Sequence, residues 1–215
     1  MTTTDHSATE NIVYRTHPDE HPSIRYRSLP SRCAGTAETL AEARVSYRTE
    51  LSGLLEVDRR NLPPMVEHVE DKVAGMWVRS KVGAVHRDRL SDRMFLQRLL
   101  EPGELQDELR AYLDSVADRG VEPVVVLTEP EDPVASVLDQ MAPRDAVVAT
   151  YPDSQVGLGW AAIHGPQTAG FDDLPVAPFE NGLRDVPIEA FAETCLATHR
   201  QRAVRVEPYA LAQAS

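Results

Sequence analysis

The chain has 215 residues, of which 42% are hydrophobic and 26% are charged, and its net charge at pH 7 is −12. This composition predicts a globular protein with a packed core, and no apolar run approaches the roughly 20 residues of a membrane-spanning helix. An acidic surface repels phosphate, and residues 131–215 carry the largest share of the negative charge. We therefore do not expect nucleic-acid binding through the C-terminal third.

Neither end of the chain nor its cysteines indicate secretion. The start "MTTTDHSATE" lacks the basic region and apolar core of a secretory signal, so we expect a cytoplasmic protein with a disordered tail over 1–10. Cys33 and Cys195 are too few for a disulfide framework, and we expect two free thiols.

Two short strands are predicted near the N-terminus. "NIVYR" and "SIRYRS" are joined by the polar, proline-containing turn 16–22. In the second strand Ile24 and Tyr26 alternate with Arg25 and Arg27, which predicts one core face and one solvated face.

An amphipathic helix is predicted next, starting after Thr39. Apolar residues recur three or four positions apart, and "TLAE" fits a capping box in which Thr39 and Glu42 bind free backbone N–H groups. The prolines at 63–64 end this helix.

A short helical turn is expected over 64–70. The segment "GMWVRSKVGAV" then predicts a third strand, or a bent pair of strands with Gly83 at the bend. The first domain is then β-β-α-β over 11–88. Its solvated sheet face would carry a basic patch that could hold a partner, formed by Arg25, Arg27, Arg79 and Lys81, although such residues are more often only the wet side of a sheet.

The second region, 89–206, is predicted to be a small α/β domain. Two helices broken at "EPG" (101–103) lead to the apolar strand "EPVVVLT", a helix in "EDPVASVLDQM" with Asp132 as its cap, and strands in "DAVVAT" and "VGLGWAAIHG". A loop over 165–187, a last helix over 188–202 and a loose tail at 207–215 follow. The overall class is α+β.

Candidates for chemistry are few. His17 and His21 flank an acidic turn, and Cys195 and His199 lie four apart on the last helix, but a solvated turn and a core cysteine explain both patterns. No phosphate-loop, nucleotide-fold, nucleophile-elbow or zinc-protease motif occurs, and "GLG" at 157–159 is too short to count. We predict no catalytic residue, no metal and no cofactor.

A ligand site at strand ends of the α/β region is the alternative. The ends of parallel strands often bind ligands, and the polar residues at these positions are Thr128, Glu129, Tyr151 and His164.

The stretch from 24 to 64 resembles the core of the HicB-type antitoxin family. That family has a β-hairpin, a Leu-Pro turn with a nearby Cys, a Gly and Thr leading into a helix, and an acidic exit followed by prolines. The matching residues are Leu29, Pro30, Cys33, Gly35, Thr39, Leu40, Glu42, Ala43, Leu54, Leu55, Glu56, Pro63 and Pro64. The turn is "LPSRC" where the family has Leu-Pro-Gly-Cys, and the match covers about residues 11–88.

The resemblance implies a partial RNase H-like layer without nuclease residues that binds a small toxin ribonuclease. The first hypothesis is therefore a non-catalytic antitoxin or regulatory module that holds a small basic protein. The alternatives are a small-molecule-binding protein or enzyme with its site in the α/β region, and a homo-oligomeric adaptor that pairs through exposed strand edges. The family's C-terminal DNA-binding motifs have no counterpart in this chain.

Overall fold

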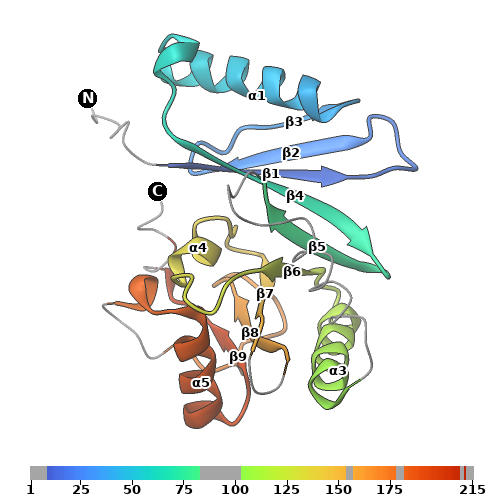
Figure 1. The fold of residues 1–215 in the computed structure, drawn as a ribbon, viewed down its shortest axis with the longest axis vertical. Helices are drawn as coiled ribbons and strands as arrows, with labels where there is room; N and C mark the ends of the chain where they lie inside the picture. Colours follow the sequence, from blue (N-terminus) through green and yellow to red (C-terminus); the bar gives the residue numbers. More distant parts are fainter. Residues whose placement is uncertain (1–8, 83–102, 154–156, 178–181, 209–210, 212–215) are drawn as a thin grey trace.

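A computed structural model describes residues 9–82, 103–153, 157–177, 182–208 and 211. These residues form a mixed α/β structure built on one nine-stranded sheet of order β3-β2-β1-β4-β5-β6-β7-β8-β9, with four α-helices packed against it (Figure 1). No helix among the described residues is long and apolar enough to span a bilayer.

The N-terminal half of the sheet contains five strands. They are β1 (Glu10–Thr16), β2 (Ile24–Leu29), β3 (Ala34–Ala37), β4 (Met65–Val73) and β5 (Met76–Lys81). The first three run antiparallel in sequence order, whereas β4 lies parallel to β1 on its other side, and β5 returns antiparallel to β4.

Helix α1 (Leu40–Leu55) makes the crossover from β3 to β4 and covers one face of this half (Figure 1). Thr39 Oγ1 accepts a hydrogen bond from Glu42 N at 3.2 Å, and Glu42 Oε2 accepts one from Glu38 N at 3.1 Å, so the predicted capping residues do cap the helix. Tyr47 and Leu51 are buried against the sheet, in a core shared with Ile12 and Tyr14 of β1.

The sheet continues into the C-terminal half because β6 (Pro123–Leu127) pairs in parallel with β5. Strand β7 (Ala146–Tyr151) is parallel to β6, β8 (Gly159–His164) is antiparallel to β7, and the short β9 (Ala203–Arg205) closes the order. β6, a helix and β7 thus form the predicted βαβ unit.

Helices cover both faces of the C-terminal half. α3 (Glu104–Asp118) packs on the face that contains Val125 and Val148, which is the same face that α1 covers further along the sheet. α4 (Ala135–Leu138) and α5 (Ile188–His199) pack on the opposite face. Two 3₁₀ turns complete the described elements, η1 (Arg59–Asn61) and η2 (Leu183–Asp185).

Several sequence-based expectations were wrong in detail. Residues 65–73 form strand β4 and not a helical turn, and strands β3 and β9 were not predicted. α4 is only four residues long, and Asp132 accepts from Glu129 N in the preceding turn and does not cap the helix. The predicted helix over 91–100 and the bend at Gly83 lie outside the described residues.

Candidate functional site

A row of charged side chains crosses four adjacent strands on the sheet face opposite α1. The strand registers place Arg25 beside Arg15, Arg15 beside Glu70, and Glu70 beside Arg79. Side chains of directly paired residues point to the same face, so the row is continuous from β2 to β5. The predicted basic patch consists of three arginines and one lysine, and all four do lie on this face: Arg25, Arg27, Arg79 and Lys81.

The face is not an outer one, however, because the C-terminal half packs against it. Arg79 is completely buried and forms an ion pair with Glu70, which is 1% exposed. Its Nη1 also donates to the backbone oxygen and to Oε1 of Gln140, just after α4, at 3.1 and 2.9 Å. Arg79 therefore ties β5 to the α4 segment, and it cannot contact a partner.

Glu70 is the acceptor at the centre of this network. Burial alone would raise its pKa, but the guanidinium groups of Arg79 and Arg15 hold the pKa of Glu70 below its ordinary value. Arg15 Nε lies 2.6 Å from the Glu70 carboxylate, and Arg15 Nη1 lies 2.6 Å from that of Glu122, ahead of β6. A second chain of charges thus joins the two halves.

The other members of the predicted patch differ in exposure. Arg27 forms an ion pair with Asp145 of the C-terminal half at 2.7 Å, and Arg25 pairs with Glu20 in the β1–β2 turn. Lys81 is exposed at the end of β5. These four residues consequently do not act as one open surface.

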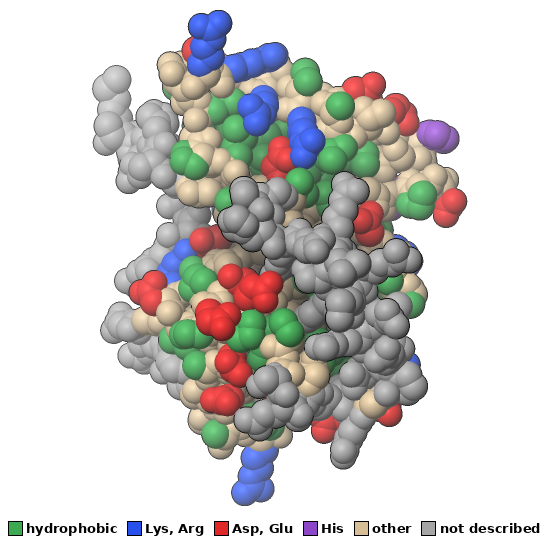
Figure 2. Space-filling model, in the orientation of Figure 1, with side chains coloured by type: hydrophobic (Ala, Val, Ile, Leu, Met, Phe, Trp, Pro, Cys, Tyr) green, Lys and Arg blue, Asp and Glu red, His purple; other side chains and the backbone are tan. Residues whose placement is uncertain are grey.

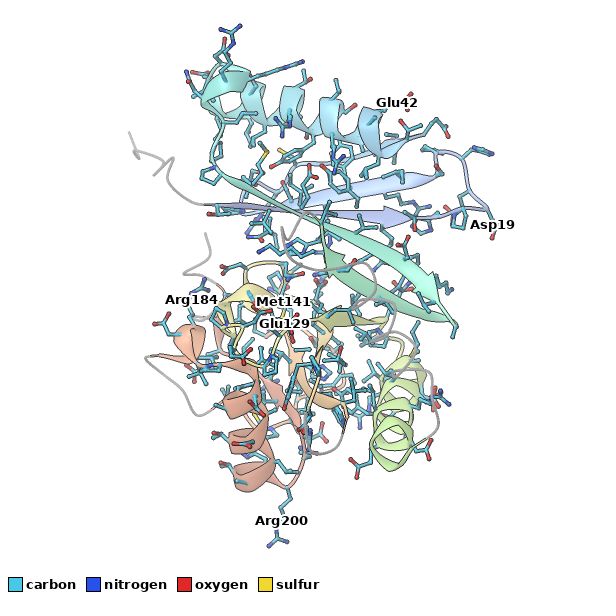
Figure 3. The ribbon with its side chains drawn as sticks, viewed as in Figure 1. Asp19, Glu42, Glu129, Met141, Arg184 and Arg200 are labelled. Atoms are coloured by element: carbon cyan, nitrogen blue, oxygen red, sulfur yellow. The ribbon has the colours of Figure 1, made fainter. Side chains whose placement is uncertain are left out.

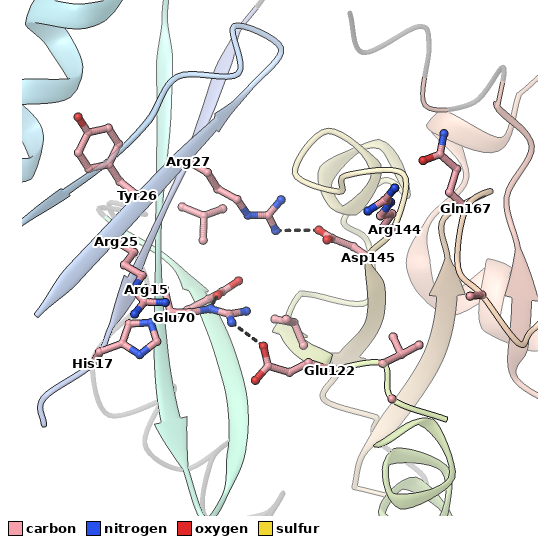
Figure 4. Close-up of a pocket in the computed structure, with 15 residues that line it drawn as sticks. Arg15, His17, Arg25, Tyr26, Arg27, Glu70, Glu122, Arg144, Asp145 and Gln167 are labelled. Carbon is pink, nitrogen blue, oxygen red and sulfur yellow. Dashed lines mark hydrogen bonds and ion pairs between the residues drawn. The ribbon is translucent and has the colours of Figure 1, made fainter. Parts of the chain in front are cut away.

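Between the two halves lies a groove of about 740 Å³, which we call the arginine groove (Figure 4). One wall comes from β1 and β2, and the other comes from the segments around residues 120–124, 144–145 and 167–169. The charged residues that line it are Arg15, Arg25, Arg27, Arg144, Glu70, Glu122 and Asp145. Of these charged residues, the sequence analysis had named only Arg25 and Arg27. The others come from segments far apart in the sequence, which only the folding of the chain brings together.

A second cavity of about 490 Å³ lies where β5 and β6 end. Thr128 and Glu129 line it together with His68 and Lys81 of the N-terminal half. Burial, followed by Arg79 and Lys81, lowers the pKa of His68 to about 3, so this imidazole is neutral and lies 3.3 Å from Asn11 Oδ1. Figure 3 places Glu129 close below the N-terminal half.

The four residues of the alternative ligand site are not brought together. Thr128 binds the backbone of Thr150, and Tyr151 at the end of β7 is buried in the core, with its ring against Gly159. His164 lies at the opposite end of the sheet, because β8 runs antiparallel to β7 and His164 pairs with Ala146. The prediction treated all these strand ends as one edge, and the antiparallel β8 separates them.

His164 instead sits in an aromatic environment under α3. Its Nε2 contacts the hydroxyl of Tyr112, and its ring lies 4.4 Å from that of Phe171, centroid to centroid. Burial, together with Arg119, lowers the pKa of His164 to about 4. Its Nδ1 is buried without a hydrogen-bond partner among the described atoms, so this histidine stays neutral at pH 7.

The remaining candidate pairs do not assemble into sites. His17 packs its ring against Trp77, whereas His21 is 87% exposed near Glu38, in the turn whose outer tip is marked by Asp19 in Figure 3. Cys195 is buried, and burial raises the pKa of its thiol to about 12. Within the described ranges, no three His, Cys, Asp or Glu side chains are grouped to hold a metal ion.

Comparison with known proteins identifies no relative of this chain. No family model matches it, and neither a curated protein nor a solved structure matches it significantly.

Proposed function

We propose that this chain is a non-catalytic, HicB-like binding protein of the cytoplasm whose N-terminal half holds a small basic protein, as an antitoxin holds its toxin. The observation that carries the proposal is the strand order β3-β2-β1-β4, with α1 connecting β3 to β4 and β4 parallel to β1. This arrangement supports the partial RNase H-like layer that the sequence resemblance implies, although the sequence itself predicted neither β3 nor β4.

The sheet edge at β3 supports a partner site. β3 ends the strand order, and its Ala34 and Thr36 side chains are exposed. An unprotected edge strand presents free backbone N–H and C=O groups, and partners commonly bind by adding a strand there. The opposite edge is less open, because β9 is bridged by residues 175–177.

The negative net charge of the chain supports a partner that is basic. The chain carries a net charge of −12, and Figure 2 shows Asp and Glu side chains gathered over the lower, C-terminal half of the face in view. Opposite charge speeds association and disfavours acidic competitors. The net negative charge of the chain would attract a small cationic protein at long range before it reaches β3.

The test is co-purification of the tagged full-length chain from its native host, with a paired edge variant. We expect a stoichiometric small basic protein that shows ribonuclease activity once it is released by denaturation. Ala34→Lys/Thr36→Lys places two charges on the edge and should weaken its retention at least about tenfold, because edge lysines block strand addition and repel a cation.

Ala197→Lys/Thr198→Lys is the matched control, since it makes the same changes at exposed positions of α5. Equal retention by both variants would contradict binding at β3. Recovery of only a homo-oligomer, measured by gel filtration with light scattering, would instead favour the adaptor hypothesis. A retained partner without ribonuclease activity would contradict the antitoxin role.

A further inference from the structure

The arginine groove concentrates positive charge on an otherwise acidic protein. Four guanidinium groups line it, and one of its three carboxylates, Glu70, is also neutralised from behind by the buried Arg79. The positive charges therefore exceed the negative ones at this place, although the chain as a whole carries −12. Such a local excess attracts anions into a cleft whose walls have a low dielectric constant.

One of these guanidinium groups is unused. Arg144 is exposed at the mouth of the groove, and within the part of the chain that the structure describes it forms neither an ion pair nor a hydrogen bond. Figure 4 shows it beside the Arg27–Asp145 pair, on the wall opposite Arg15 and Arg25. Its donors are free for a ligand.

A second polar group in the groove lacks a partner as well. The Nε2 atom of His17 is buried and has no hydrogen-bond partner in the described structure, and its ring is held edge-on to Trp77 at 5.3 Å. Buried polar atoms are normally satisfied, so this unsatisfied nitrogen in the groove wall is available for a hydrogen bond with a ligand.

Size and shape limit the ligand class. A volume of about 740 Å³ lies in the range of small-molecule sites, which occur preferentially between the lobes of a protein. Apolar wall is supplied by Val13, Val121 and Val124. Guanidinium groups that approach from different elements suit a phosphate, whose several oxygens each accept charge-assisted hydrogen bonds.

We propose that the arginine groove binds a phosphate-bearing small molecule of about nucleotide size, with its phosphate held by Arg144 and Arg27 and its apolar part along the valine wall. This site is separate from strand β3, and it uses residues from both halves of the chain. Ligand binding there would stabilise the contact between the halves.

The experiment is calorimetric titration of the isolated full-length chain at low salt. The probes are inorganic phosphate, pyrophosphate and adenosine monophosphate. Adenosine is the control that lacks a phosphate, and citrate is the control whose negative charge comes from carboxylates. We expect at least one phosphate probe to bind with a Kd below about 1 mM, and adenosine to bind at least about tenfold more weakly than adenosine monophosphate.

Arg144→Gln should weaken binding of the phosphate probe at least about tenfold, since a charge-assisted hydrogen bond is lost. Arg48→Gln removes the same charge from an exposed position of α1 and should leave the Kd unchanged. Arg144 is exposed and has no partner among the described residues, so we expect its replacement to leave the stability of the fold unchanged, which urea denaturation of the variant checks.

Absence of binding by all three phosphate probes would overturn the proposal. So would equal weakening by the two variants, which would indicate an effect of net charge alone. Preference for citrate over every phosphate probe would overturn the assigned ligand class. None of these results depends on a protein partner, so the antitoxin proposal is tested separately.

Discussion

Among single residues, His164 carries a clear consequence for pH. Its imidazole is completely buried between β8, Tyr112 and Phe171, and its folded pKa is lowered to about 4. The unfolded chain, with an ordinary histidine pKa of about 6.5, binds more protons than the folded chain between these two values. The contribution of His164 to stability is therefore full above about pH 6.5 and is lost as the pH drops toward 4.

The free energy of unfolding of the parent chain should fall between pH 7 and pH 5. In His164→Leu this fall should be smaller by about 2 kcal/mol. Urea unfolding at the two pH values measures this difference. Tyr112→Phe is the control and should keep most of the pH dependence, because burial is the main cause of the lowered pKa. An unchanged pH dependence in His164→Leu would show that this histidine is not the titrating group.

At the scale of elements, the contact between β5 and the α4 segment depends on one buried cation. Arg79 binds Glu70 on β4 and Gln140 after α4 at once. Removing one member of a buried ion pair leaves the other charge uncompensated, whereas removing both is much less costly. Glu70 would retain only Arg15.

Arg79→Met should lower the free energy of unfolding by about 3 kcal/mol, and the double variant Arg79→Met/Glu70→Met should recover at least about half of that loss. Arg25→Met, which breaks an exposed pair with Glu20, should cost at most about 1 kcal/mol. Urea denaturation gives all three values. A double variant that is as unstable as Arg79→Met, with no recovery, would contradict the proposed coupling.

The same elements show what the sequence could and could not predict. α1, β6 and β7 were predictable, because a capping box and continuous apolar runs act locally. β4 was not, since "MVEHVEDKV" alternates polar residues that look solvated, and Glu70 is accommodated only by Arg79 and Arg15 from other strands. The groove was missed for the same reason: Arg144 and Asp145 meet Arg27 only through packing of the two halves.

Across the whole molecule, one sheet connects the halves that the sequence had assigned to separate regions. β5 pairs with β6, and Trp77 of β5 packs in the same core cluster as Val124 and α5. The Arg15–Glu122 and Arg27–Asp145 pairs add contacts across the groove. Halves joined by backbone pairing, a common core and ion pairs are expected to unfold together.

The two tryptophans allow this cooperativity to be measured. Trp77 reports on β5 and Trp160 on β8, and the chain has no other tryptophan. In Trp160→Phe the fluorescence follows β5 where it packs on the C-terminal core, and in Trp77→Phe it follows β8. In each variant we expect the urea midpoint from fluorescence to coincide with that from far-ultraviolet circular dichroism. Separate midpoints within one variant would mean that the halves unfold independently, and that the ion pairs across the groove contribute little to joining them.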